Sequence, residues 1–280
     1  MRSILLLDNG SRRPASTLEL RRLAARLTAC RGEPVLPVSL QHADAVPPEQ
    51  LNDRPAAILA PTLRRLLDAG TGELIILPLF FGPSQGLAQL LPTTSERLAI
   101  RVARELCPLP QGEPRLVDIL KDQVRRTATE CGQTAARVVL VDHGSPTPGV
   151  SAVRHWLAES LAARLGPGVA LEQAAMERRP GSDYDFNGPL LEDLLRRLAS
   201  ADSRTPITLA MLFLSPGRHA GPGGDIDRIR ASVTADHPGL QIHTSPLVGS
   251  HPALVDILLA RLAEAERSPP RHTSRTASPR

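Results

Sequence analysis

The sequence predicts an α/β fold made of two tandem units, each a four-stranded parallel sheet with helices on both faces. Three observations carry this prediction. Short apolar runs alternate with longer helical patterns, which is typical of strands joined by crossover helices. The runs at residues 4–7 and 138–141 are continuously apolar, as expected for strands covered on both faces. The chain of 280 residues also repeats several of its own words at similar spacing.

The repeat consists of three pairs of words. The pairs are 4–11 (ILLLDNGS) with 138–145 (VVLVDHGS), 79–83 (LFFGP) with 212–216 (LFLSP), and 116–120 with 254–258, both LVDIL. From Asn9 to Leu116 is 107 positions, and from His143 to Leu254 is 111. We therefore expect an N-terminal unit at 1–130, a C-terminal unit at 137–266 and a linker at 127–136. The arginine-containing tail at 267–280 is expected to be disordered.

The elements follow in order. In the first unit we expect strands at 3–8, 34–40, 73–81 and 100–106, and helices at 15–29, 55–69, 86–98 and 113–126. In the second we expect strands at 137–142, 170–176, 207–214 and 240–244, and helices at 150–165, 190–199, 226–234 and 251–266. Four strands per unit favour a flavodoxin-like strand order, 2-1-3-4, with right-handed crossovers.

The composition excludes several classes of protein. Aromatic residues make up only 2% of the chain, which argues against stacking platforms for nucleic acid. The net charge of +4 is matched by four arginines in the tail, so it does not indicate a nucleic-acid-binding face. Three cysteines without a CxxC spacing argue against a disulfide framework. No apolar run reaches about 18 residues, and we expect a soluble, cytoplasmic protein without a signal peptide.

The strand ends of the second unit predict a metal site. Ligands of open parallel sheets bind beyond the carboxyl ends of the strands, where the strand order reverses. There, His143 follows strand 1, Glu177 follows strand 2 and His219 follows strand 3. Two imidazoles and a carboxylate suit a divalent first-row metal with positions left open.

Each candidate also has a simpler interpretation. A single histidine after a strand is more often an ordinary loop residue, and Glu177 alone is as readily a solvated carboxylate. Two histidines at the ends of strands 1 and 3 of one unit favour the site. His251 is interpreted mainly as a helix start and His155 as a helix-surface residue.

Other polar features of the second unit could serve a ligand. The stretch 221–225 (GPGGD) is interpreted as a mobile turn into a helix whose N-terminus could receive a substrate carboxylate. Four arginines could bind an acidic ligand, although each alone is typical of a surface charge: Arg154, Arg178, Arg179 and Arg218.

Three of these words resemble a known family. Residues 142–145 (DHGS), 176–179 (MERR) and 213–221 (FLSPGRHAG) are similar to the sirohydrochlorin chelatases, the class II chelatases of cobalamin and sirohaem synthesis, in their long, two-unit, CbiX/SirB-like form. Residues 77–84 extend the resemblance into the first unit, and it spans about residues 2–265. It implies a chelatase-like fold with two units facing across a cleft.

The resemblance also implies an activity, a lyase reaction that inserts Co2+ or Fe2+ into sirohydrochlorin without ATP or an organic cofactor. The metal ligands carry over only to His143 and His219, with Glu177 as third participant. Asn9 stands where the family usually has histidine, and no histidine follows within 81–91. The family often has its working site in the N-terminal unit, but here we assign it to the second.

In the mechanism this suggests, the two histidines hold the ion or accept the pyrrole protons, because imidazole has a pKa of about 6.5. Substrate contacts are expected from Arg178, Arg218, Ser145 and Ser84. The tetrapyrrole would be the only partner of a monomer or homodimer, and the choice of metal stays open.

Two other functions compete with chelation. The first is a non-catalytic carrier of metal or tetrapyrrole, which would bind stoichiometrically and stop. The second is a nucleotide-binding regulatory α/β protein, but neither strand 1 is followed by the glycine-rich loop that such a protein would need.

Overall fold

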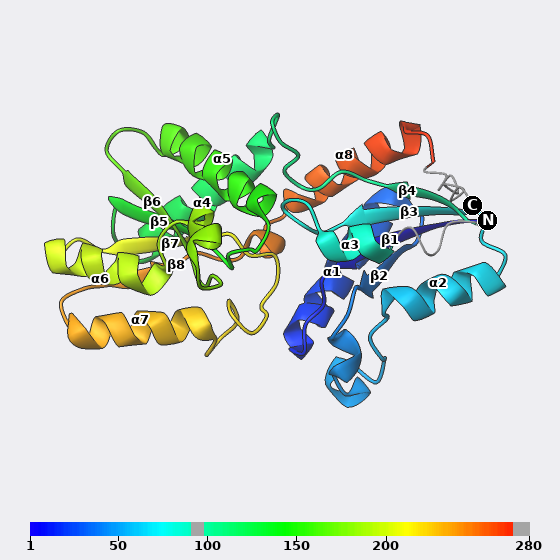
Figure 1. Cartoon of the computed structure of the whole chain (residues 1–280), viewed down its shortest axis with the longest axis horizontal. Coiled ribbons are helices and arrows are strands. Elements are labelled where there is room, and N and C mark those ends of the chain that lie inside the picture. The colour runs from blue at the N-terminus through cyan, green and yellow to red at the C-terminus, as the bar shows by residue number, and fades with distance from the viewer. Residues whose placement is uncertain (91–97, 271–280) are drawn as a thin grey trace. The chain divides into compact units, whose positions relative to one another are not determined.

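The computed structural model describes residues 1–90 and 98–270, which contain both predicted sheets. They form two compact units: one comprises Met1–Leu106 and the segment that begins at Val255, and the other comprises Cys107–Leu254. Each unit has a four-stranded parallel sheet, in the orders β2-β1-β3-β4 and β6-β5-β7-β8 (Figure 1). The predicted α/β class and the strand order 2-1-3-4 are confirmed.

The first unit contains the strands β1 (Arg2–Asp8), β2 (Val35–Ser39), β3 (Glu73–Pro78) and β4 (Ala99–Val102). Its helices are α1 (Pro14–Arg31), α2 (Leu59–Asp68), α3 (Gln85–Leu90) and α8 (Leu254–Arg267), with short 3-10 turns at Ala43–Ala45 and Pro48–Leu51. The helix predicted at 86–98 begins at Gln85, and its expected continuation through 91–97 lies outside the described residues.

The second unit contains the strands β5 (Arg137–Asp142), β6 (Ala170–Ala175), β7 (Ile207–Met211) and β8 (Ile242–Thr244). Its helices are α4 (Pro114–Glu130), α5 (Pro148–Leu165), α6 (Leu191–Ala201) and α7 (Asp225–Asp236), with 3-10 turns at Ser182–Asn187 and Val248–Ser250. Helices α4 and α5 pack together, as do α6 and α7, and the two pairs lie on opposite sides of the sheet (Figure 1).

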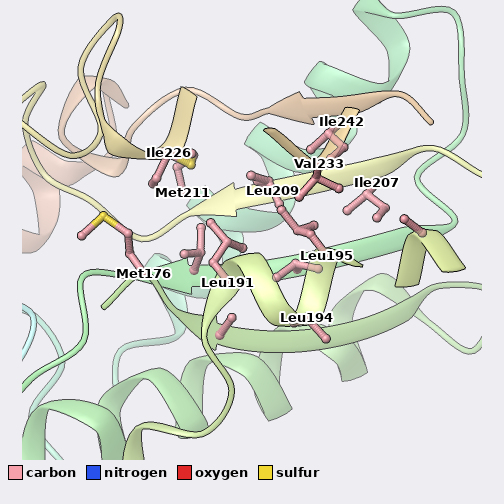
Figure 2. Close-up of a cluster of buried hydrophobic side chains, with 14 of the residues drawn as sticks. Met176, Leu191, Leu194, Leu195, Ile207, Leu209, Met211, Ile226, Val233 and Ile242 are labelled. Atoms are coloured by element: carbon pink, nitrogen blue, oxygen red, sulfur yellow. The ribbon is translucent and has the colours of Figure 1, made fainter. Parts of the chain in front are cut away.

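The core of the second unit follows from two periodicities. Alternate residues of β7, Ile207, Leu209 and Met211, point to the face covered by α6 and α7. Helix α6 meets them with Leu191 and Leu195, which are four residues apart and so share one face (Figure 2). Burying each such side chain contributes about 2 kcal/mol to the stability of the folded unit. This packing holds in place the strands whose ends carry the polar residues.

The last helix of each sequence repeat packs in the other repeat's unit. In α4, the Gln123 side-chain amide donates to the carbonyl of Leu247 at 2.9 Å, within the second unit. In α8, Arg261 donates to the carbonyls of Glu105 at 2.9 Å and Leu106 at 3.3 Å, within the first unit. The compact units therefore differ in their bounds from the repeat units 1–130 and 137–266, because α4 and α8 are exchanged.

Several boundary predictions need correction. The strands predicted at 73–81, 100–106 and 207–214 end at 78, 102 and 211, and the helix predicted at 55–69 begins at 59. Three further corrections concern the ends of the repeats. The linker predicted at 127–136 is wrong for 127–130, which form the end of α4 because Thr127 and Ala128 are buried. The helix predicted from His251 begins at Leu254, because a 3-10 turn ends at Ser250. The tail predicted from residue 267 is wrong at Arg267, which ends α8; residues 271–280 lie outside the described residues.

Candidate metal site

A glycine brings the first two ligands together. Gly144 has φ +85°, and a Cβ at this position would lie 2.0 Å from the carbonyl oxygen of Glu177. Only glycine permits that backbone conformation and approach. The amide of Glu177 donates to the carbonyl of His143 at 3.1 Å, so the ends of β5 and β6 remain paired beyond the strands. His143 and Glu177 are thus neighbours at the rim of the sheet.

His219, from the loop after β7, completes a group of three. His143 Nε2 lies 3.1 Å from His219 Nε2 and 3.2 Å from Glu177 Oε1. The three ligand atoms all lie within 4.8 Å of one another. Two nitrogens at this separation can both lie about 2.1 Å from one ion, which is a normal metal–imidazole distance. The structure therefore brings together the three residues that the sequence singled out.

The group is open to solvent on one side. The side chains of His143 and Glu177 are 47% and 60% exposed, whereas His219 is 24% exposed. Burial lowers the pKa of His219, and the neighbouring His143 lowers it further. A neutral imidazole keeps its lone pair for a metal or a proton. The site can thus bind a cation from one side and leave the other side free for a second ligand.

Asp225 is a residue of the site that sequence reasoning missed. Its Oδ2 lies 2.6 Å from Nδ1 of His219. The carboxylate also pairs with Arg228, and Arg218 Nε lies 3.6 Å away. Asp225 is the first residue of α7, where the sequence pointed to a helix N-terminus that could receive a substrate carboxylate. The carboxylate of Asp225 occupies that position instead. The available signal for Asp225 in the sequence was an aspartate at the end of a glycine-rich turn.

A buried ionic network supports the loop that carries His143. Arg154 is fully buried and pairs with Asp142, while its Nε donates to Gln173 at 3.1 Å. Burial raises the pKa of Asp142, and Arg154 opposes that shift. The interpretation of Arg154 as a surface charge is therefore wrong. Asp142, the partner of Arg154, lies directly before His143. Arg154 therefore has a structural role, which is to support this loop.

Asn187 holds the same loop from the other side. Its Oδ1 accepts the amide of Ser145 at 2.9 Å and the hydroxyl of Ser151 at 2.9 Å. Its Nδ2 donates to the carbonyl of Ser145 at 2.9 Å. Asn187 is fully buried, and nothing in its local sequence distinguishes it from a loop asparagine. The sequence therefore could not identify it.

The remaining predicted residues have mixed positions. Ser145 lies beside the group, and its Oγ accepts the amide of Thr147 at 3.0 Å. The side chain of Arg218 is 73% exposed, whereas Arg178 pairs with Asp185 at 2.9 Å. Ser84 belongs to the first unit and is not part of the group of three.

His251 and His155 are likewise outside the group. His251 Nε2 lies 3.3 Å from Asp122 Oδ2. His155 is half-buried on α5, so its interpretation as a surface residue is only partly correct. Burial lowers the pKa of His155.

The first unit repeats the backbone of the site with different side chains. Gly10 has φ +82°, and a Cβ there would lie 1.9 Å from the carbonyl oxygen of Gln41. The amide of Gln41 points to the carbonyl of Asn9 at 3.3 Å, matching the pair in the second unit. Asn9 and Gln41 thus occupy the positions of His143 and Glu177. Side-chain amides are poor ligands for these metals.

Comparison with known proteins agrees with this description. The CbiX family model matches residues 137–265. SirB from Bacillus subtilis with Fe3+ has a TM-score of 0.67 at 17% identity, covering 95% of this chain and 96% of that chain. SirB from the subspecies spizizenii in complex with cobalt has a TM-score of 0.63 at 17% identity, covering 95% of each chain. CbiX, described as the terminal enzyme of sirohaem biosynthesis in denitrifying bacteria, has a TM-score of 0.60 at 19% identity, covering 94% of this chain and 99% of that chain.

The fold is a chelatase-like α/β fold with two four-stranded parallel sheets. The resemblance to the CbiX/SirB sirohydrochlorin chelatase family is confirmed by the family model over the C-terminal repeat and by the shared two-sheet fold. No curated protein sequence matches the chain. At such identities the solved structures establish the fold alone. Among the helices in the described ranges, none has the length and apolar character to cross a bilayer.

Proposed function

We propose that this protein is a sirohydrochlorin chelatase, which inserts Co2+ or Fe2+ into the tetrapyrrole without ATP in cytoplasmic cobalamin or sirohaem biosynthesis. The observation that carries the proposal is the convergence of His143, His219 and Glu177 at one open rim. The CbiX match over the same repeat supports it, as do the related SirB proteins described with iron and with cobalt.

Metal insertion requires a partly dehydrated divalent ion and the removal of two pyrrole N–H protons. The two imidazoles and Glu177 offer one anionic and two neutral donors, which offset the charge of the incoming ion and replace some of its water. As the ion passes to the macrocycle, two protons leave its nitrogens. The imidazoles are suitable acceptors because their ordinary pKa is about 6.5.

Substrate contacts form the second part of the proposal. Tetrapyrroles of this class carry several carboxylate arms, which guanidinium groups bind well. The side chain of Arg218 is 73% exposed and that of Arg178 is 33% exposed, and Arg178 would exchange Asp185 for substrate. The backbone amide of Ser145 already donates to Asn187, and its Oγ accepts the amide of Thr147, so Ser145 would offer the substrate the proton of its hydroxyl. Ser84, the fourth predicted substrate contact, belongs to the first unit and stays a prediction.

The test is an absorbance assay with purified protein, sirohydrochlorin and Co2+, Fe2+ or Ni2+ in turn. We expect turnover well beyond one equivalent and a loss of two or more orders of magnitude in His143→Ala and His219→Ala. His237→Ala is the control, because His237 caps the far end of α7, away from the strand ends. An undiminished rate in the two site variants would refute the assignment. A reaction that stops at one equivalent would favour the non-catalytic carrier. The first unit, which has the poor ligands Asn9 and Gln41, is also compatible with that function.

A further inference from the structure

We propose that Asp225 is a positioning residue that fixes the tautomer and orientation of His219. The inference rests on the proposed function for its biological meaning, but the geometry stands by itself. Asp225 Oδ2 lies 2.6 Å from His219 Nδ1, and the other ring nitrogen, Nε2, lies 3.1 Å from His143 Nε2. The carboxylate thus contacts one nitrogen while the other faces the metal ligands.

The tautomer follows from the donor and acceptor inventory. A carboxylate accepts hydrogen bonds and does not donate them, so the proton of a neutral His219 must be on Nδ1. Nε2 then carries the lone pair and points toward His143 and Glu177. Metal-bound histidines commonly donate their second N–H to a carboxylate or carbonyl, which fixes the ring and makes the ligand nitrogen more basic.

Asp225 is itself held in place. Arg228 pairs with Oδ1, and the guanidinium of Arg218 lies 3.6 Å from Oδ2. The side chain of Asp225 is only 20% exposed, and the N-terminus of α7 favours its negative charge. A carboxylate fixed on both oxygens restricts the rotation of the ring that donates to it. The bond to His219 is therefore part of a rigid arrangement.

The other histidine is oriented differently. His143 Nδ1 lies 3.0 Å from the carbonyl of Gly144, so its second nitrogen faces the backbone. Substitution cannot remove that carbonyl. Asp225 is thus the side chain through which the orientation of one ligand histidine can be changed while all three ligands remain.

The experiment compares Asp225→Ala with Asp227→Ala by titrating each full-length protein with Co2+ alone. Both aspartates lie in the first turn of α7, so both variants lose one negative charge near the helix N-terminus. Asp227 contacts the Gly223 amide at 2.8 Å and Arg230 at 3.1 Å, not a histidine. We expect Asp225→Ala to weaken Co2+ binding about 10- to 100-fold, Asp225→Asn to lie between it and the wild type, and Asp227→Ala to change it less than about threefold.

Nitrogen-15 NMR of the histidine rings in metal-free protein reads the tautomer directly. We expect His219 to carry its proton on Nδ1 in the wild type and in Asp227→Ala, and to become a mixture of tautomers in Asp225→Ala. The signals are assigned from their loss in His219→Gln. An unchanged tautomer, or Co2+ affinities that are equal in Asp225→Ala and Asp227→Ala, would overturn the positioning role.

The two proposals fail in different ways. If the wild type binds Co2+ but does not turn over sirohydrochlorin, the proposed function fails, while the affinity and tautomer comparisons still test Asp225. If the wild type turns over and Asp225→Ala keeps its affinity, tautomer and rate, the function stands and the positioning role fails. If the wild type binds no Co2+, the NMR comparison in metal-free protein alone decides the role of Asp225.

Discussion

The two units build the same rim on the same backbone and equip it with different side chains. Gly10 and Gly144 share a left-handed conformation and the same close approach to the neighbouring loop. Asn9 and Gln41 then stand where the second unit has His143 and Glu177. The difference teaches that the sheet and its glycine preserve the position of a site, whereas a few side chains decide whether it can bind a metal.

The contrast extends below the rim. Asp8 and Asp142 end the first strand of their sheets and are both 7% exposed. Asp142 pairs with Arg154, which lies six positions after the first residue of α5. The equivalent position in α1 is occupied by Leu20, which has no charge. Asp8 Oδ1 has no hydrogen-bond partner in the described structure, and burial raises the pKa of Asp8 to about 6. The first unit thus keeps the buried acid without its counter-ion.

The comparison can be broken most strongly at Arg154. Arg154→Leu gives the second unit the residue pattern of the first and leaves Asp142 buried without its cation. We expect the free energy of unfolding to fall by about 3–5 kcal/mol, as for other buried pairs that lose one partner. Trp156 is the single tryptophan and lies in the second unit, so its fluorescence in a urea titration reports this unit. Equal stability of variant and wild type would contradict the network's structural role.

Replacing Asp8 or Asp142 by asparagine should change the free energy of unfolding in opposite directions at pH 8. Because the pKa of Asp8 is about 6 in the folded state and 3.8 ordinarily, its ionisation opposes folding progressively from about pH 4 to pH 6. Asp8→Asn should therefore stabilise the protein above pH 6, by up to about 3 kcal/mol, and have little effect at pH 4. Asp142→Asn should instead destabilise it, since Arg154 loses its counter-ion. Circular dichroism melts at both pH values check this; a stabilised Asp142→Asn would reject the contrast.

Arg261 tests the exchange of helices between the repeats. Arg261→Ala removes charged hydrogen bonds to the Glu105 and Leu106 carbonyls, so we expect the first unit to lose about 2 kcal/mol. Far-UV circular dichroism follows both units, whereas Trp156 fluorescence follows the second. We expect the unfolding transition followed by circular dichroism to shift more than the transition followed by Trp156 fluorescence. If fluorescence alone moved, the assignment of α8 to the first unit would be wrong.

The smallest expected effect is at the exposed rim. Arg218→Ala should raise the KM for sirohydrochlorin several-fold, or about 1 kcal/mol, with little change in kcat, because one of several exposed guanidinium contacts is lost. Arg197→Ala is the matched control, since Arg197 is an exposed arginine of α6 that pairs with Glu172 of β6. Steady-state kinetics measure both. A larger loss of kcat than of affinity would mean that Arg218 acts through Asp225.

The sequence was sufficient for the features that depend on local pattern. Continuous apolar runs predicted both first strands, and topology then predicted that residues after strands 1, 2 and 3 would meet. Those residues, His143, Glu177 and His219, do meet. The sequence could not indicate that Arg154 is buried, because its burial depends on an acid from another element. Asp225 was missed as a partner of His219 for a similar reason, since a turn's path decides which side chains it brings together.

The exchange of α4 and α8 has a consequence for synthesis of the chain. Residues 1–106 leave the ribosome long before residues 254–267, yet the first unit acquires α8 only from that late segment. Cys107–Leu254, by contrast, forms a continuous stretch that can assemble as it emerges. Of the two units, the one whose sheet is synthesised first is therefore completed last. The unit that carries His143 and His219 can fold before it.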